Sequence, residues 1–170
     1  SAASDVYKRQ QQLNRKQNHS RYFVANADNG STELLLEDKD EAWIDVRNTW
    51  PYQDKAGWKF INGGKEFLYT SEKDGWSHVY RYDIEKREEF LVTKGDYDVI
   101  RPLSFDEEKG DIYFIASPKD PTERYLYKTS ENNELELVTP KLLEGTHNYQ
   151  ISTKSCLLYT SDAADEITGV

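Results

Sequence analysis

An internal repeat limits what this chain can fold into. Residues 67–93, FLYTSEKDGWSHVYRYDIEKREEFLVT, return in altered form as residues 113–139, YFIASPKDPTERYLYKTSENNELELVT, at an offset of 46 residues. A half copy lies upstream, where residues 22–36 align with residues 79–92. Self-similarity at a fixed period in this range is typical of arrays in which each unit packs only against its neighbours. The chain is therefore predicted to be part of a repeat array.

Each copy of the repeat predicts strands joined by tight turns. In the first copy, Lys65–Ser71 is a short apolar run, and His78–Ile84 places alternate apolar side chains on one face. In the upstream half copy, Asp28–Ser31 contains an Asn-Gly pair, which is a strong hairpin pattern. No segment shows a sustained helical period, so an all-β chain is expected.

The burial expected along each unit predicts the architecture. Phe67–Tyr69 and Ile112–Ile115 lack polar alternation, as expected where neighbouring sheets cover both faces of a strand. Glu134–Leu137 alternates, as expected at a solvated edge. A gradient from buried to exposed strands with this period is typical of β-propeller blades. The prediction is a partial β-propeller with about two four-stranded blades, the outer half of an earlier blade and the start of a later one.

Innermost strands are predicted at Ala42–Arg47 and at Tyr97–Arg101, where the two arginines align at an offset of 54 residues. Inner strands line the central channel of a propeller, so Arg47 and Arg101 would be placed to meet a peptide carboxylate or carbonyl. The alternative, which is favoured, is that each arginine forms an ion pair between blades.

The two ends of the chain are predicted to be foreign to the array. SAASDVYKRQ, residues 1–10, can be encoded by DNA whose reverse complement encodes CLLYTSDAA, which occurs within residues 155–170. Two ends of one natural protein have no reason to be complementary in this way. The DNA resembles a transposon-end sequencing adaptor, and such appended segments are excluded from fold reasoning. The propeller fragment is therefore assigned to residues 11–154.

Composition excludes several classes of partner. The chain carries 31 acidic and 22 basic residues, a net charge of -9, and an acidic surface argues against a nucleic-acid partner. The single cysteine, Cys156, lies in the excluded C-terminal segment, so residues 11–154 hold neither a disulfide nor a thiolate metal site. No apolar run approaches the roughly 18 residues of a membrane-spanning helix. No cofactor is predicted.

Two motifs that suggest catalysis or metal binding fail on their context. Gly75–His78 begins like the nucleophile elbow of a serine hydrolase, but Val79 stands where the elbow needs a second glycine, so a hairpin turn is favoured. His19, His78 and His147 lack the spacing of a zinc site. No catalytic residue and no metal ligand is assigned, and the substrate-binding residues stay unknown.

Four stretches of the sequence resemble one known family: LNRKQNHSRYFV at residues 13–24, FLYTSEKDGWSHVYRYD at 67–83, VTKGDYDV at 92–99 and GTHNYQIS at 145–152. They resemble the N-terminal β-propeller of dipeptidyl peptidase IV and its bacterial relatives, in the prolyl oligopeptidase family of serine peptidases. The resemblance covers residues 11–154, and generic propellers share the period without these motifs.

The resemblance implies an exported exopeptidase that removes dipeptides from peptide N-termini. In such enzymes the propeller restricts access to an α/β-hydrolase domain of the same chain, and the catalytic Ser, Asp and His lie in that domain. The paired glutamates that hold the substrate amino group in this family have no match in this sequence. The implied role of the fragment is therefore non-catalytic, as a wall and gate for peptide substrates.

The residues leave one alternative function open. A stand-alone propeller that binds protein or glycan, with no enzymatic activity, has the same repeat pattern, because the propeller fold serves both roles. A downstream Gly-x-Ser-x-Gly motif followed by Asp and then His distinguishes the peptidase from the binding module.

Overall fold

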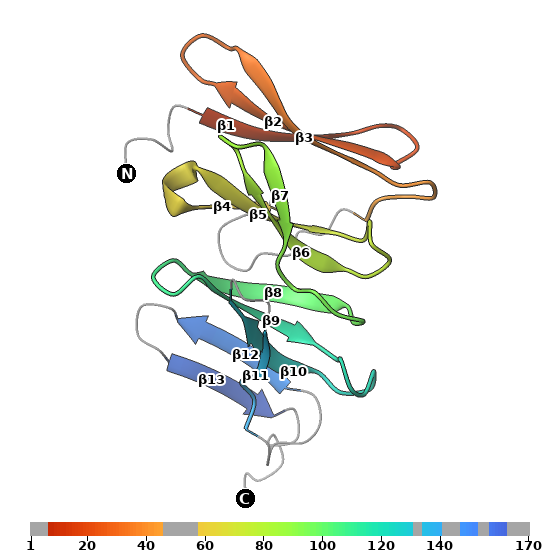
Figure 1. Ribbon diagram of the computed structural model, residues 1–170, viewed down its shortest axis with the longest axis vertical. Helices are drawn as coiled ribbons and strands as arrows, with labels where there is room; N and C mark the ends of the chain where they lie inside the picture. Colours follow the sequence, from red (N-terminus) through yellow and green to blue (C-terminus); the bar gives the residue numbers. More distant parts are fainter. Residues whose placement is uncertain (1–6, 46–57, 131–133, 141–146, 153–156, 163–170) are drawn as a thin grey trace, which may run out of the picture. The chain divides into compact units, whose positions relative to one another are not determined.

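The computed structural model describes residues 7–45, 58–130, 134–140, 147–152 and 157–162. This part of the chain contains thirteen β-strands in four antiparallel sheets and one short 3-10 turn, with no α-helix (Figure 1). None of its helical segments has the length and apolarity to cross a membrane. The chain divides into two compact units, Ser1–Leu91 and Val92–Val170. The all-β prediction is confirmed.

The first unit contains two sheets. Strands β1 (Tyr7–Leu13), β2 (His19–Asn26) and β3 (Thr32–Lys39) pair in the order β1-β2-β3. The second sheet is a four-stranded meander, β4-β5-β6-β7, formed by β4 (Trp58–Ile61), β5 (Glu66–Ser71), β6 (His78–Asp83) and β7 (Glu88–Leu91). The turn η1 (Asn62–Gly64) joins β4 to β5.

The second unit repeats the meander. It has the order β8-β9-β10-β11, formed by β8 (Val99–Asp106), β9 (Asp111–Ala116), β10 (Tyr125–Thr129) and β11 (Leu135–Leu137). Strands β12 (His147–Ser152) and β13 (Leu157–Asp162) pair with each other. Two meanders of equal strand order, with three strands before and two after them, confirm the prediction of about two blades and partial flanking blades.

Both terminal segments that the sequence assigns to an adaptor contribute to strands. Strand β1 begins at Tyr7, and β13 covers Leu157–Asp162. The origin of these segments stays a prediction, which sequencing across both ends of the reading frame tests.

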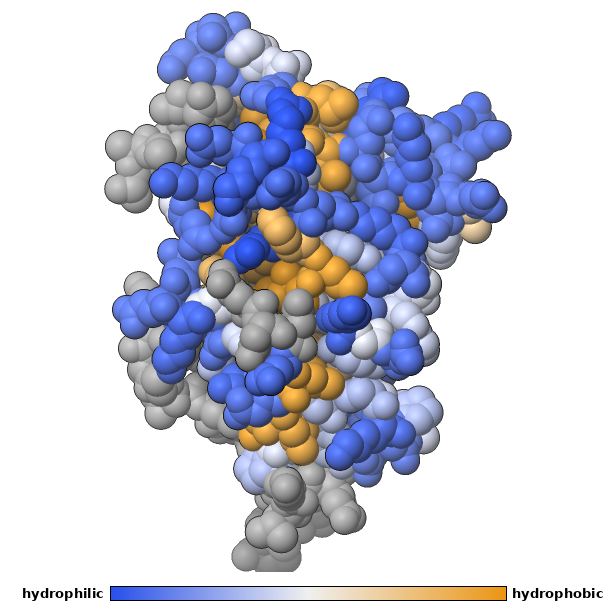
Figure 2. Space-filling model, in the orientation of Figure 1, coloured by the Kyte–Doolittle hydropathy of each residue, from blue (hydrophilic) through white to orange (hydrophobic). Residues whose placement is uncertain are grey.

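Burial falls from the inner to the outer strands, as predicted. In β5, Phe67, Leu68 and Tyr69 are fully buried, so both faces of this strand are covered. In the outer strands β7 and β11, by contrast, Phe90 and Leu135 are each 38% exposed. Hydrophilic residues cover most of the face shown in Figure 2, and apolar residues are visible in places between them.

The strand registers refine the repeat. Tyr69 pairs with Tyr80 between β5 and β6, and Phe114 pairs with Tyr127 between β9 and β10. Structurally equivalent residues are therefore 45 residues apart in β5 and β9 and 47 apart in β6 and β10. The offset of 46 seen in the sequence is an average over a turn that differs by two residues between the copies.

The predicted position of the first innermost strand is wrong. Of Ala42–Arg47, the described residues 42–45 are not in a strand, and Arg47 lies outside the described residues. The innermost strand of this blade is β4, which pairs with β5 through Trp58 and Tyr69. The second prediction, Tyr97–Arg101, overlaps only the start of β8. The error arises because the connection from β3 to β4 is far longer than the connection from β7 to β8, so alignment at one offset cannot match both.

Aromatic side chains join the two sheets of the first unit. The cluster comprises Tyr22 and Leu35 from one sheet, and Trp58, Phe67, Tyr69, Tyr80 and Tyr82 from the other. The Tyr22 ring meets the edge of Trp58 at 5.3 Å between centroids, and Trp58 meets Phe67 at 4.9 Å. Such edge-to-face pairs each add about 0.5–1.5 kcal/mol beyond the burial of their surface. This cluster is the core of the unit.

Hydrogen bonds also cross the same interface. The Tyr82 hydroxyl donates to the Leu35 carbonyl at 2.7 Å, and the Arg9 guanidinium donates to the Trp58 carbonyl at 3.3 Å. The first bond satisfies the polar end of a buried ring, which is the usual requirement for a tyrosine in a core. The contacts fix how β3 lies against β6 and how β1 lies against β4.

The second unit has its own core, formed by Leu103, Ile115, Leu126 and Tyr149. The Thr139 hydroxyl accepts the Leu126 amide at 2.9 Å and lies 2.8 Å from the Tyr149 hydroxyl. The threonine that ends the repeat therefore links β10 of the blade to the strand that follows, β12.

Gly95, in the Thr-Lys-Gly-Asp stretch, makes a close approach that needs glycine. A Cβ at this position would overlap the ring of Tyr97, which is only 5% exposed. The sequence therefore keeps glycine here because a buried aromatic ring occupies the space of a side chain.

Three hairpins share one turn geometry. The side chain of the first turn residue accepts backbone amides two or three residues later, and the fourth residue after it has a left-handed φ. The first and last residues of these turns are Asn26 and Gly30, Asp83 and Arg87, and Asp106 and Gly110. Two turns place glycine in the left-handed position, where it is nearly free of strain, and the third places Arg87 there at φ 57°.

We expect Arg87→Gly to be more stable than Arg87→Ala by about 1 kcal/mol, because only glycine relieves the left-handed strain. Both variants lose the ion pair between Arg87 and Glu33 (2.5 Å), in which both side chains are more than half exposed and which contributes little. The midpoints of urea unfolding of the two variants measure the difference. Equal midpoints, or a higher midpoint for Arg87→Ala, would contradict the strain argument.

Candidate functional site

The first unit contains a small open pocket with a cavity volume of about 20 Å³, which we call the connection pocket. One wall comes from the end of β3 and the segment after it, and the other from the end of β5 and the connection to β6. The lining residues are Asp38, Asp40, Trp43, Ile44, Asp45, Thr70, Ser71, Glu72, Lys73 and Ser77. Four carboxylates and one ammonium therefore surround the pocket.

The segment after β3 is held by its own backbone contacts. The Asp40 carboxylate accepts the amides of Ala42 at 2.7 Å and of Trp43 at 3.1 Å, which forms a turn. The Ile44 amide donates to the Gln17 carbonyl at 2.6 Å. This turn leaves Trp43 61% exposed at the pocket, and a large exposed aromatic side chain in a pocket is suited to contact a ligand.

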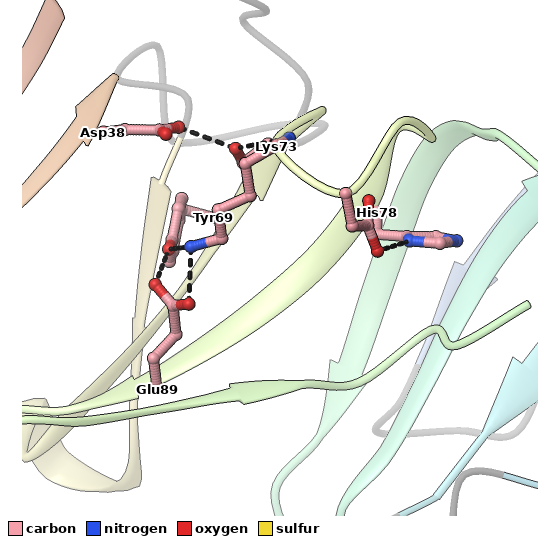
Figure 3. Close-up of polar contacts among 7 residues, drawn as sticks. Asp38, Tyr69, Lys73, His78 and Glu89 are labelled. Atoms are coloured by element: carbon pink, nitrogen blue, oxygen red, sulfur yellow. Dashed lines mark hydrogen bonds and ion pairs between the residues drawn. The ribbon is translucent and has the colours of Figure 1, made fainter. Parts of the chain in front are cut away.

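A buried carboxylate closes the inner end of the pocket. Asp38 is 5% exposed, and the Ser71 hydroxyl donates to it at 2.7 Å (Figure 3). The Ser71 oxygen in turn accepts the Lys73 amide at 3.3 Å. Because Asp38 belongs to β3 and Ser71 to β5, this hydrogen bond joins the two sheets at the pocket.

Lys73 reaches from the pocket to the outer strand of its blade. Its ammonium lies 2.5 Å from the Glu89 carboxylate and donates to the Tyr69 hydroxyl at 2.9 Å. The Tyr69 hydroxyl also donates to Glu89, so the three groups form a closed triangle (Figure 3). The ammonium also lies 4.2 Å from the centre of the Tyr80 ring, within cation–π range.

The environment of Tyr69 keeps its hydroxyl protonated. Burial, followed by the hydrogen bond to Glu89 and the charge of Glu89, raises the pKa of Tyr69 far above its usual value. Tyr69 is therefore a hydrogen-bond donor at every pH at which a protein normally works.

This arrangement is suited to binding and to positioning. Tyr69 is held neutral, the Lys73 ammonium is paired with Glu89, and the Ser71 hydroxyl is bonded to Asp38. A nucleophile needs a neighbouring base that can take its proton. These groups are instead hydrogen-bonded or ion-paired with one another, so the arrangement does not favour nucleophilic catalysis. Trp43 offers an exposed aromatic face at the pocket, which is suited to contact cationic or aromatic groups of a ligand.

The Gly75–His78 stretch forms the end of a hairpin connection, as predicted. It leads into β6, where a nucleophile elbow would lead into a helix. His78 is 1% exposed, and its Nδ1 donates to Asp74 at 2.7 Å. Burial alone would raise the pKa of Asp74, but the hydrogen bond and the charge of His78 together outweigh burial. The pKa of Asp74 is therefore below its usual value. A peptide has no access to a histidine buried to this degree.

The other sequence-predicted residues lie apart from the pocket or outside the described residues. His19 lies 3.2 Å from Glu37, which also contacts Arg21 at 3.0 Å. Arg101 is exposed on β8, and the Arg47 position and the His147 side chain lie outside the described part. In the described part of the chain, no three metal-ligating side chains gather around a common point.

Sequence reasoning missed the polar network of Tyr69, Ser71 and Glu89. By strand register, the equivalent residues in the second blade are Phe114, Ala116 and Leu135. The network therefore exists in one copy only, and each of its members is apolar in the other. Polar residues at positions that are apolar in the other copy were the signal available in the sequence.

Comparison with known proteins gives the family. The profile described as "Dipeptidyl peptidase IV (DPP IV) N-terminal region" matches residues 4–162. The sequence is 26% identical over 124 residues to dipeptidyl peptidase 4 of Trichophyton rubrum, which covers 72% of this chain and 15% of that protein. It is 29% identical over 107 residues to a probable dipeptidyl peptidase 4 of Aspergillus flavus. This match covers 63% of this chain and 14% of that protein. The chain thus spans about 15% of the length of these curated relatives.

Two solved structures share the fold. Dipeptidyl peptidase 4 of Porphyromonas gingivalis superimposes with a TM-score of 0.72 at 24% identity, over 87% of this chain and 20% of that one. A putative dipeptidyl aminopeptidase IV of Bacteroides ovatus superimposes with a TM-score of 0.73 at 17% identity. The superposition covers 94% of this chain and 24% of that one. At these identities the likeness concerns the fold alone.

We expect Tyr69→Phe to lower stability at neutral pH by about 1 kcal/mol, through the lost hydrogen bond to Glu89. An unfolded tyrosine loses its proton near pH 10, whereas the folded Tyr69 keeps it. Above pH 10 the folded state therefore binds more protons than the unfolded state, and stability falls as pH rises. Tyr69→Phe does not lose stability in this way. The difference in the free energy of unfolding between the wild type and the variant should therefore become smaller above pH 10. Denaturant titrations at pH 8 and pH 11 measure this difference in the free energy of unfolding. A difference that is equal or larger at pH 11 contradicts the argument.

Tyr97 in the second unit should show the same kind of pH dependence over a narrower pH range. Burial, followed by the charge of Tyr127, raises its pKa to about 12. Its contribution to stability should therefore be lost between pH 10 and pH 12, and Tyr97→Phe should remove that part of the pH dependence.

Proposed function

The chain belongs to the family of dipeptidyl peptidase IV N-terminal regions, and on that premise we propose that it is the non-catalytic propeller portion of an exported serine dipeptidyl peptidase. The parent protein cleaves dipeptides from the N-termini of peptides. The observation that carries the proposal is the family match over nearly the whole chain. The two four-stranded meanders support it, because they are the blades that such a propeller needs.

In this proposal, catalysis belongs to an α/β-hydrolase domain of the parent chain. That domain supplies a Ser-His-Asp triad for acyl transfer, and the propeller limits which peptides reach it. The connection pocket is in keeping with a non-catalytic role, because Ser71, Tyr69 and Lys73 are hydrogen-bonded or ion-paired to neighbouring side chains.

The connection pocket is the part of this fragment that we propose to contact peptide substrates. Trp43 offers an exposed aromatic face, and the turn formed by Asp40 holds the backbone beneath it. A preformed side chain of this kind adds contact surface with little loss of conformational freedom on binding. The part of a peptide that extends beyond the scissile dipeptide would rest on it.

The first experiment is to recover the coding sequence on both sides of the chain. A Gly-x-Ser-x-Gly motif downstream, followed by Asp and then His, supports the peptidase. A propeller that closes and then stops supports the alternative, a binding module for protein or glycan, and the enzymatic proposal is then wrong.

In the parent enzyme we expect Trp43→Ala to raise KM roughly tenfold for peptides of several residues, since a lost aromatic contact weakens binding by about this factor. The proposal places the pocket beyond the scissile dipeptide, so hydrolysis of a chromogenic dipeptide substrate should be unchanged. Trp76→Ala is the matched control, because Trp76 is also exposed (39%) and does not line the pocket. Equal effects on both substrates, or the same effect from Trp76→Ala, would exclude the pocket as a substrate contact.

A further inference from the structure

The chain contains two Asn-Gly pairs, and both lie in exposed turns. Asn29 and Gly30 are in the β2–β3 hairpin, and Asn62 and Gly63 are in the η1 turn between β4 and β5. Asparagine followed by glycine is chemically labile, because the small neighbour lets the following backbone nitrogen reach the side-chain carbonyl carbon. We propose that Asn62 is a site of spontaneous deamidation in the folded chain, and that Asn29 is protected.

Two hydrogen bonds protect Asn29. The Gly30 amide, which is the attacking group, donates to the Asn26 carbonyl at 2.9 Å. The Asn29 side-chain oxygen accepts the Ser31 amide at 2.9 Å, which fixes the rotamer of the carboxamide. The reaction at Asn29 therefore requires both bonds of the turn to open first.

Asn62 lacks the first of these restraints. Gly63 lies in the first turn of a short 3-10 segment, where leading amides have no intrahelical carbonyl, and among the described residues its amide has no hydrogen-bond acceptor. The Asn62 side chain donates its NH₂ group to Glu66, so its carboxamide, like that of Asn29, is held by one hydrogen bond. The two sites therefore differ in the attacking amide, which is hydrogen-bonded at Gly30. The one backbone bond that closes the turn, from the Lys65 amide to the Asn62 carbonyl, is long at 3.4 Å.

The reaction is balanced without any cofactor. The Gly63 nitrogen forms a bond to Cγ of Asn62, the bond from Cγ to the side-chain nitrogen breaks, and ammonia leaves with the proton from the Gly63 amide. The product is a five-membered succinimide. Water then adds to either of its two carbonyls, and the ring opens to aspartate or to isoaspartate at position 62.

The product weakens the turn in which it forms. A carboxylate at position 62 cannot donate to Glu66, and it places a second negative charge beside that side chain. The isoaspartate form also adds a carbon to the backbone between β4 and β5. The altered turn adjoins β4, the innermost strand of the blade, which contributes Trp58 to the aromatic cluster.

The test is to incubate the full chain at mildly alkaline pH and follow each Asn-Gly peptide by proteolysis and mass spectrometry. Without denaturant, Asn62 should deamidate about fivefold faster than Asn29, the factor expected for one ordinary hydrogen bond. In concentrated urea the two rates should become equal, because the local sequences are then exposed alike. Equal rates without denaturant, or a faster reaction at Asn29, would overturn the proposal.

Two matched variants separate the chemistry from folding. Gly63→Ala and Gly30→Ala place the same side chain at similar left-handed φ values, 66° and 71°, in positions where a Cβ meets no neighbouring atom. Gly63→Ala should abolish most of the deamidation in the folded chain, whereas Gly30→Ala should leave the reaction at Asn62 unchanged. A much faster reaction at Asn62 in Gly30→Ala would show that it depends on global unfolding, which would overturn a local cause.

Discussion

The contact of Tyr22 with Trp58 and Phe67 is the interaction on which the rest of the first unit depends. A propeller blade is a thin sheet that is apolar on both faces, so it is stable only when a neighbouring sheet covers it. Tyr22 comes from β2 and the other two rings from β4 and β5, so this contact covers one face of each sheet. Without it, the inner strands of the second sheet would expose large aromatic rings to water.

The polar groups of the connection pocket lie at the end of this same interface. Asp38 and Ser71 come from strands of different sheets, and the hydrogen bond between them forms only when the aromatic cluster holds those sheets in register. Lys73 and Glu89 then extend the network to the outer strand. The positions of the pocket residues are therefore a consequence of packing between sheets, and changes in the cluster should disturb the pocket even where no pocket residue is altered.

The sequence predicts this fold well where the periodicity is local. Alternation, apolar runs and the Asn-Gly pair locate the hairpins, and the repeat supplies the strand order of both meanders. The first innermost strand was misplaced because the chain segment between β3 and β4 has no counterpart of equal length between β7 and β8. Pairs such as Asp38 with Ser71, 33 residues apart in the chain, depend on which sheet faces which, and no local pattern contains that information.

A comparison of the two blades shows why the site is found in one of them. Equivalent positions that pack the blade keep their character, as Tyr80 and Tyr127 do, since both blades must fill the same space between sheets. Positions that form the polar network do not, since Glu89 corresponds to Leu135. A buried or half-buried polar group needs all of its partners at once, so a network arises as a set or is absent. In a repeat protein, sets of polar residues present in one copy alone are therefore the places to look for function.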